Sequence, residues 1–188
     1  MMATRTNQKY RTRSAIVDAT RELITGGADI TMAAVAKAAL VSEATAYRYF
    51  PDLVTLLSEA MVDVAPNPEV AMAPVAGNDD PVERVAFATE LLLRHTLARQ
   101  GAVRAMMSAS ITRPESAATR RPVQRFGLID QALIGLDPAT TQQLRRDLAV
   151  VMSAEALFIL TDLCGLSPED AVASAVRTAR TVTETAVR

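Results

Sequence analysis

The stretch that most constrains the fold of this chain is residues 31–50, which read TMAAVAKAALVSEATAYRYF. Apolar residues recur at helical spacing on both sides of a tight break, and Thr31 and Ser42 stand where a side-chain oxygen can cap a helix. Two short helices joined by a tight turn are typical of a helix-turn-helix, whose second helix enters a DNA groove. The sequence therefore predicts a helix-turn-helix here. The alternative is a pair of ordinary core helices.

Individual positions in this stretch can be given roles. Ala36 is small enough for the two helices to touch there. Ser42 would leave the first backbone N–H groups of the second helix free to face a phosphate. The residues predicted to anchor and close the module are Val35, Val41, Ala46, Tyr47 and Phe50. The side chains predicted to be exposed on the second helix are Ser42, Glu43, Thr45 and Arg48.

The charge of the chain is balanced overall but uneven along its length. The 188 residues carry a formal net charge of −1, so the chain as a whole is not a polycation. Residues 1–13, however, contain no acidic side chain and four cationic ones, Arg5, Lys9, Arg11 and Arg13. A short basic arm of this kind favours contact with DNA phosphates. The alternative is a solvated, disordered terminus.

Helix signals are frequent and strand signals are nearly absent, so we predict an all-α fold of about nine helices. The first helix ends at Gly26-Gly27, and a fourth starts at Pro51-Asp52. Further along, Asp80, Asp137 and Ser167 each place a capping side chain directly before a helix-starting proline. The later helices are predicted near residues 81–99, 101–111, 121–135, 138–163 and 168–187.

Two domains are predicted. Residues 1–52 would form a three-helix DNA-binding domain, and residues 53–188 a helical body for ligand binding and dimerisation. A helix from Leu53 to Val64 would join the module to the body. Residues 64–80 contain three prolines, one glycine and two aspartates, so we predict a loop or linker there.

The composition excludes several classes of protein. Hydrophobic residues make up 49% of the chain and charged residues 22%, which excludes a disordered or fibrous protein. The single cysteine, Cys164, excludes an internal disulfide and is expected to be a buried, inert thiol. With one histidine, no Gly-rich phosphate loop and no nucleophile elbow, we expect no metal, no cofactor and no enzymatic activity. Neither a signal peptide nor a membrane span is predicted, so we expect a soluble cytoplasmic protein.

Residues 11–57 resemble the DNA-binding domain of the tetracycline-repressor (TetR) family of bacterial transcriptional regulators. The matching residues are Thr31, Val35-Ala36, Ala39, Val41-Ser42, Thr45, Tyr47-Arg48-Tyr49-Phe50, Pro51 and Leu56-Leu57. The resemblance implies a sequence-specific DNA-binding regulator, a repressor that a small molecule releases from a palindromic operator. Carried over by position, it implies DNA contacts from Lys9, Arg11, Thr31, Ser42, Glu43, Ala44, Thr45, Tyr47, Arg48 and Tyr49.

Three positions depart from the pattern of the family. Leu40 stands in the turn where the family usually has Gly, and Ala44 stands where Gly often precedes the Thr. Leu53 replaces the Lys that usually opens the fourth helix as a phosphate anchor. Leu40 and Leu53 motivate an alternative function, a TetR-like ligand-binding or interaction protein that has lost DNA binding.

The body offers a surface for pairing. Residues 148–163 read LAVVMSAEALFILTDL and are apolar almost all round, so a helix there must be covered on both sides. TetR-like proteins pair through their last two long helices, and we expect a homodimer that reads a palindrome. The predicted interface residues are Val151, Ile159, Leu163, Val172, Ala175, Ala179 and Val182. The alternative is a monomer with a thick core.

The body could also enclose a small-molecule effector of apolar character. Aromatic and methionine side chains form adaptable apolar pockets, and isolated polar groups could orient a ligand there. The candidate ligand-binding residues are Phe87, Leu91, Arg94, His95, Met106, Met107, Phe126, Met152, Glu155 and Phe158. The alternative is an ordinary core with ion pairs between helices.

Overall fold

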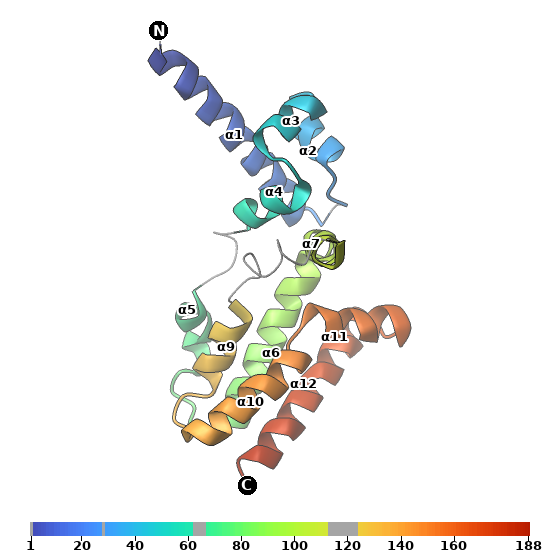
Figure 1. Cartoon of the computed structure of the whole chain (residues 1–188). Helices are drawn as coiled ribbons and strands as arrows, with labels where there is room; N and C mark the ends of the chain where they lie inside the picture. Colours follow the sequence, from blue (N-terminus) through green and yellow to red (C-terminus); the bar gives the residue numbers. More distant parts are fainter. Residues whose placement is uncertain (1, 28, 62–66, 113–123) are drawn as a thin grey trace. The chain divides into compact units, whose positions relative to one another are not determined.

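The computed structural model describes residues 2–27, 29–61, 67–112 and 124–188. Every regular element in these ranges is a helix, which confirms the predicted all-α fold (Figure 1). The chain divides into two compact units. The first comprises residues 1–65 and 98–121, and the second comprises residues 66–97 and 122–188. The first unit therefore combines the N-terminal segment with a piece from the middle of the chain.

The first unit is built around the helix-turn-helix. Its helices are α1 (Met2–Thr25), α2 (Met32–Ala38), α3 (Glu43–Tyr49), α4 (Leu53–Ala60) and α7 (Gln100–Thr112). α1 packs against α2 and α4, and α7 packs against α4. Ile16, Phe50, Leu56 and Leu57 are fully buried at the centre, and Ala102 of α7 completes this core. Burial of each large side chain contributes roughly 1.5–3 kcal/mol, which holds the short α2 and α3 in place.

The basic N-terminal segment is helical rather than disordered. α1 begins at Met2 and continues to Thr25, so Lys9, Arg11 and Arg13 lie on the helix that buries Ile16. A helix fixes the direction of each side chain, whereas a free arm does not. Basic residues four apart, such as Lys9 and Arg13, therefore lie on one face.

Helix caps form where the sequence predicts them. The Thr31 hydroxyl accepts a hydrogen bond from the N–H of Ala34 over 3.1 Å, and that of Ser42 accepts one from Thr45 over 3.2 Å. Asp80, Asp137 and Ser167 accept from backbone N–H groups at the starts of their helices. Each such cap contributes about 1 kcal/mol, and each is local in sequence.

The second unit packs its helices around an aliphatic core. Its elements are α5 (Pro68–Met72), the 3₁₀ turn η1 (Ala73–Val75), α6 (Pro81–Ala98), α9 (Gln124–Ala132), α10 (Pro138–Val151), α11 (Ala154–Phe158), the π-helical turn η2 (Ile159–Leu163) and α12 (Pro168–Ala186). Leu144, Leu148 and Met152 lie at its centre with Ile129 and Ala179. No helix among the described residues is long and apolar enough to cross a membrane.

Two predictions about this unit are wrong. The single helix predicted for residues 138–163 is interrupted, because α10 ends at Val151 and Ser153 caps a new helix by accepting from the N–H of Ala156. Residues 67–80 are not all loop, because the side chain of Asn67 caps α5 and Met72 is buried in the core. In both places a local capping side chain outweighs the overall composition of the segment.

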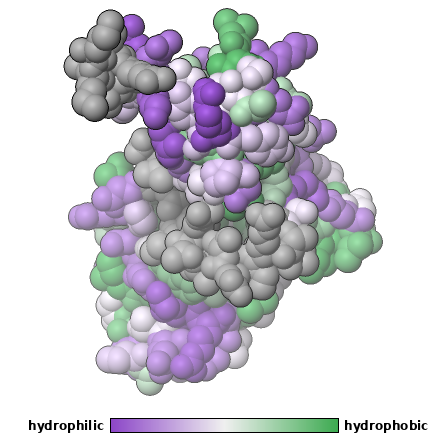
Figure 2. Space-filling view, turned by 45° about the horizontal axis from the view of Figure 1, so that its top comes forward, coloured by the Kyte–Doolittle hydropathy of each residue, from purple (hydrophilic) through white to green (hydrophobic). Residues whose placement is uncertain are grey.

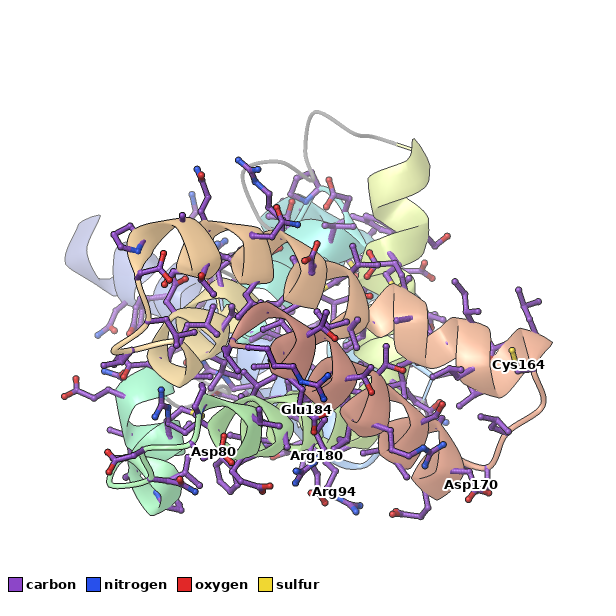
Figure 3. The ribbon with its side chains drawn as sticks, turned by 90° about the horizontal axis from the view of Figure 1, so that it is seen from below. Asp80, Arg94, Cys164, Asp170, Arg180 and Glu184 are labelled. Carbon is purple, nitrogen blue, oxygen red and sulfur yellow. The ribbon has the colours of Figure 1, made fainter. Side chains whose placement is uncertain are left out.

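The prediction of a buried cysteine is also wrong. Cys164 is exposed and lies at the end of η2 (Figure 3). Its apolar neighbours Ile159 and Leu163 are 52% and 80% exposed. The thiol lies past the last packed turn, where the helix face no longer meets the core.

Candidate nucleic-acid interface

The turn between α2 and α3 is closed by a Schellman motif. The N–H of Leu40 donates to the carbonyl of Lys37 over 3.2 Å, and the N–H of Val41 donates to that of Ala36 over 2.9 Å. This motif places a left-handed residue after the helix cap, and Leu40 has a φ of 55°. A β-carbon in that conformation costs roughly 1–2 kcal/mol. The hydrogen bonds therefore maintain the turn although it lacks glycine.

α3 presents its outer face to solvent. The Ser42 side chain caps the helix, and its hydroxyl also pairs with that of Thr45 over 2.8 Å. Ala46 is fully buried against the core, which fixes which side of this short helix faces outward. The exposed side chains of the segment are Ser42, Glu43, Ala44, Tyr47 and Arg48.

Arg13 fastens α3 to the rest of the unit. Its guanidinium donates to both carboxylate oxygens of Glu59 on α4 and to the carbonyl of Tyr49 at the end of α3, the last over 3.1 Å. The same group lies 4.3 Å from the ring centroid of Phe50. One side chain of α1 therefore contacts the end of α3, the residue after it and α4. Its planar fork of donors suits this role better than a lysine ammonium would.

A groove of about 740 Å³ lies between α1 and α3. Three cationic residues line it and no acidic one does. Its lining residues are Gln8, Lys9, Thr12, Arg13, Val41, Ser42, Thr45, Arg48 and Tyr49. The guanidinium of Arg48 lies 5.5 Å from the ring centroid of Tyr49, and both residues line the groove. The groove thus combines positive charge with hydroxyl groups, the chemistry that contacts nucleic-acid phosphates.

The groove brings together half of the residues predicted to contact DNA. Lys9, Ser42, Thr45, Arg48 and Tyr49 line it. The remaining predicted residues lie outside the lining but are all exposed, namely Arg11, Thr31, Glu43, Ala44 and Tyr47. They lie on α1 and α3 or cap α2, so every predicted contact residue either lines the groove or is exposed.

Sequence reasoning missed two lining residues, Gln8 and Thr12. With Lys9 and Arg13 they follow the i, i+4 spacing of one helix face. The sequence does contain a signal for these two residues. If the helical spacing that includes Ile16 is continued towards the N-terminus, it predicts which side chains of the basic segment share a face. A disordered arm has no helical spacing, so the prediction of an arm could not assign these side chains to one face.

One residue of the helix-turn-helix occupies a place other than the one predicted. Tyr47 is 47% exposed and therefore does not close the core, a position that Phe50 fills alone. Leu53, which stands where a phosphate-binding lysine is usual, is half-buried and packs against the core of the first unit. Its side chain contributes to packing, and the positive charge of this surface comes from α1 and Arg48.

The predicted ligand-binding residues are divided between the two units. Met106 and Met107 lie on α7 of the first unit, where Met106 packs against the core. The others lie in the second unit, where Phe87, Leu91, Phe126 and Met152 are part of its core. Arg94 is exposed and forms ion pairs with Glu90 and Glu169. Phe158 is buried, whereas His95 and Glu155 are half-buried.

The predicted interface residues differ sharply in exposure. Val172, Ala175 and Ala179 are buried within the chain itself, because α12 turns its apolar face toward α10. Val151 and Val182 are half-buried and pack against the same core. Ile159 and Leu163 are exposed. A side chain already covered within one chain offers little surface to a second one.

Comparisons with known proteins place this geometry in a family. Residues 16–60 match the family model described as bacterial regulatory proteins, tetR family. The fold is similar to the crystal structure of a TetR transcriptional regulator from Rhodococcus sp. RHA1, with a TM-score of 0.58 and 22% sequence identity over 93% of this chain and 97% of that one. A search of curated proteins gave no match.

The matched residues run from the centre of α1 to the end of α4 and include the whole helix-turn-helix. Together with the shared fold, they define a DNA-binding transcriptional regulator of the helix-turn-helix class. Residues 16–60 carry the DNA-binding domain of the tetR family of bacterial regulatory proteins, and the chain shares the fold of a TetR transcriptional regulator. The resemblance noted in residues 11–57 is thereby confirmed.

Proposed function

We propose that this protein is a homodimeric repressor that binds a palindromic operator in the cytoplasm and is released from it by an apolar small molecule. The observation that carries the proposal is the basic groove between α1 and α3, which adjoins the exposed start of α3. α3 would enter the major groove, and the cationic groove would hold the phosphates of the strand beside it.

The charges of the groove favour this docking. Arg13 is neutralised by Glu59, whereas Lys9 and Arg48 extend the positive surface from α1 to α3. Each phosphate contact releases bound counterions, so the affinity should fall steeply as salt rises. Glu43 is the one acidic residue on α3, and its carboxylate can accept a hydrogen bond from a cytosine amino group.

A dimer would place two copies of α3 about 34–36 Å apart, one turn of DNA, and so would read a palindrome. The support on the second unit is its exposed apolar surface at Ile159 and Leu163. The effector would act by binding the DNA-bound and the free states of the protein with different affinities. α4 would transmit this effect, because it joins the helix-turn-helix to the rest of the chain. The apolar and aromatic side chains in the second unit's core favour an apolar effector.

The test begins with selection of binding sites from a randomised DNA duplex by the full chain, followed by gel shifts at two salt concentrations. We expect a palindromic site and a steep loss of affinity with salt. Replacing Tyr47 and Arg48 together by alanine should abolish this binding and leave the dimer intact. The matched control is Arg177→Ala, which removes an exposed cation on α12. Failure of the unaltered chain to select any sequence would support the alternative, a ligand-binding protein without DNA affinity.

A further inference from the structure

Leu40 is an unusual residue for the turn of a helix-turn-helix. Its side chain is 93% exposed, more than any other large apolar side chain among the described residues. It is also the one non-glycine residue in that part of the chain with a positive φ. The protein therefore carries both backbone strain and an exposed leucine at one position, and no packing within the chain offsets either.

The side chain is held in a defined place. The two hydrogen bonds of the Schellman motif fix the backbone on either side of Leu40, and Val41 packs against the core of the first unit. The strain of the left-handed conformation therefore does not relax by movement of the turn. Leu40 projects as a fixed apolar group between the end of α2 and the cap of α3.

The surroundings of Leu40 are those of the proposed DNA-binding surface. Val41 and Ser42, which follow it directly, line the basic groove. Figure 2 shows mainly hydrophilic side chains where α2 and α3 lie, and Leu40 is an exposed apolar side chain among them. An apolar group continuous with a phosphate-binding surface meets the same DNA that the surface binds. The apolar group that DNA offers in the major groove is the C5-methyl group of thymine.

We propose that Leu40 is a specificity-determining residue that contacts a thymine methyl group of the operator. This inference rests on the proposed DNA binding and assigns it one further contact. It also accounts for the missing glycine, because a residue without a side chain would leave that methyl group uncovered. The strain in the turn would then be offset only when DNA is bound.

The proposal predicts opposite effects of one substitution on stability and on binding. Leu40→Gly relieves the strain and removes no internal packing, so the melting temperature should rise by about 2–4 °C. The same change should weaken binding to the selected operator on the order of tenfold. Leu40→Ala keeps the β-carbon and is the matched control, with a similar loss of affinity and no rise in melting temperature. A turn residue with a purely structural role would change affinity and stability in the same direction.

The methyl group is tested on the DNA side. Each thymine of the selected operator is replaced in turn by deoxyuridine, which removes only the C5-methyl group. We expect one position in each half-site where this replacement weakens binding of the unaltered protein, and no further loss there with Leu40→Ala. Equal weakening by Leu40→Ala on all these operators would show that Leu40 contacts a part of the DNA other than a thymine methyl group and would overturn the assignment.

Two further outcomes distinguish loss of the Leu40 contact from loss of DNA binding altogether. If Leu40→Gly and Leu40→Ala bind the operator as tightly as the unaltered protein, Leu40 makes no DNA contact and this inference is wrong while the proposed function stands. If the unaltered protein selects no DNA sequence, the proposed function fails and the inference fails with it. In either case the shift in melting temperature still reports the strain in the turn.

Discussion

Arg13 and Glu59, 46 residues apart in the sequence, form an ion pair with two hydrogen bonds that joins α1 to α4, and the Nε donor lies 3.2 Å from Oε1. The two side chains are 41% and 40% exposed, so solvent screens their attraction. The stabilising effect of Arg13 therefore comes as much from its bond to the Tyr49 carbonyl and its contact with Phe50 as from the charge pair.

Arg13→Ala should lower the free energy of unfolding by about 1–2 kcal/mol, because it removes all three contacts. Glu59→Gln, which removes only the charge, should cost less than about 1 kcal/mol. Urea denaturation of the full chain measures both. Arg11→Ala is the control, since Arg11 is exposed on the same helix two residues away. If Arg11→Ala lowers the free energy of unfolding as much as Arg13→Ala does, the contacts of Arg13 with α3 and α4 do not stabilise the unit as proposed.

Acid should weaken the second unit through Glu83. Hydrogen bonds from Arg180 of α12 hold the pKa of the Glu83 carboxyl on α6 below its ordinary value. Because this pKa is lower in the folded state than in the unfolded chain, the pair stabilises the protein above the unfolded pKa of Glu. That contribution is lost as the pH falls through the folded pKa. Asp137, whose pKa the hydroxyl and backbone N–H of Thr140 also lower, should add to the effect.

Urea denaturation at pH 7, 5, 4 and 3 measures this effect. At neutral pH the free energy of unfolding of Glu83→Gln should be lower than that of the unaltered protein, and this difference should vanish in acid. Asp79→Asn, a change at an exposed loop residue, serves as control. A difference that persists unchanged at pH 3 would mean that Glu83 acts through packing rather than through its charge.

The exposed end of the second unit should control dimerisation. Leu163 is 80% exposed and Ile159 is 52% exposed beside it, and Figure 2 shows apolar surface on the side of the molecule where Figure 1 places α11. In a symmetric dimer one substitution changes the interface twice. Leu163→Glu should therefore raise the dissociation constant of the dimer at least about tenfold, because it places a carboxylate against apolar surface.

Sedimentation equilibrium measures this constant directly. Val70→Glu is the matched control, since Val70 is 67% exposed on α5 and its replacement adds the same charge. Dimerisation that is unaffected by Leu163→Glu would move the interface to another surface of the second unit.

Local signals made the helix caps and the helix-turn-helix predictable. The hydroxyls of Thr31 and Ser42 bond to backbone three residues away, so their role depends on the sequence beside them and on little else. The same kind of signal was present at Ser153, but the long apolar run around it favoured a continuous helix. The structure shows that a buried capping serine divides that run.

Features that depend on contacts distant in sequence were not predictable in the same way. The exposure of Cys164 depends on where the packed face of α11 and η2 ends. The basic groove depends on the register of α1 against α3, which Arg13 fixes through residues 36 and 46 positions away. The sequence predicts which residues can contact DNA, whereas the packing of α1 decides which of them share one groove.

The packing of α5 on α9 leaves no room for a side chain at Gly127 of α9. These two helices lie against each other, and a β-carbon on Gly127 of α9 would lie 2.6 Å from Cγ of Pro68. The proline ring cannot move aside as the end of a flexible side chain would. Gly127→Ala should therefore destabilise the second unit by about 1–2 kcal/mol, although alanine alone would favour the helix by up to about 1 kcal/mol. Gly77→Ala, where a β-carbon would meet nothing within 4 Å, should be neutral or slightly stabilising. Thermal unfolding followed by circular dichroism compares the two, and a stabilising Gly127→Ala would show that α5 and α9 pack less closely than this contact requires.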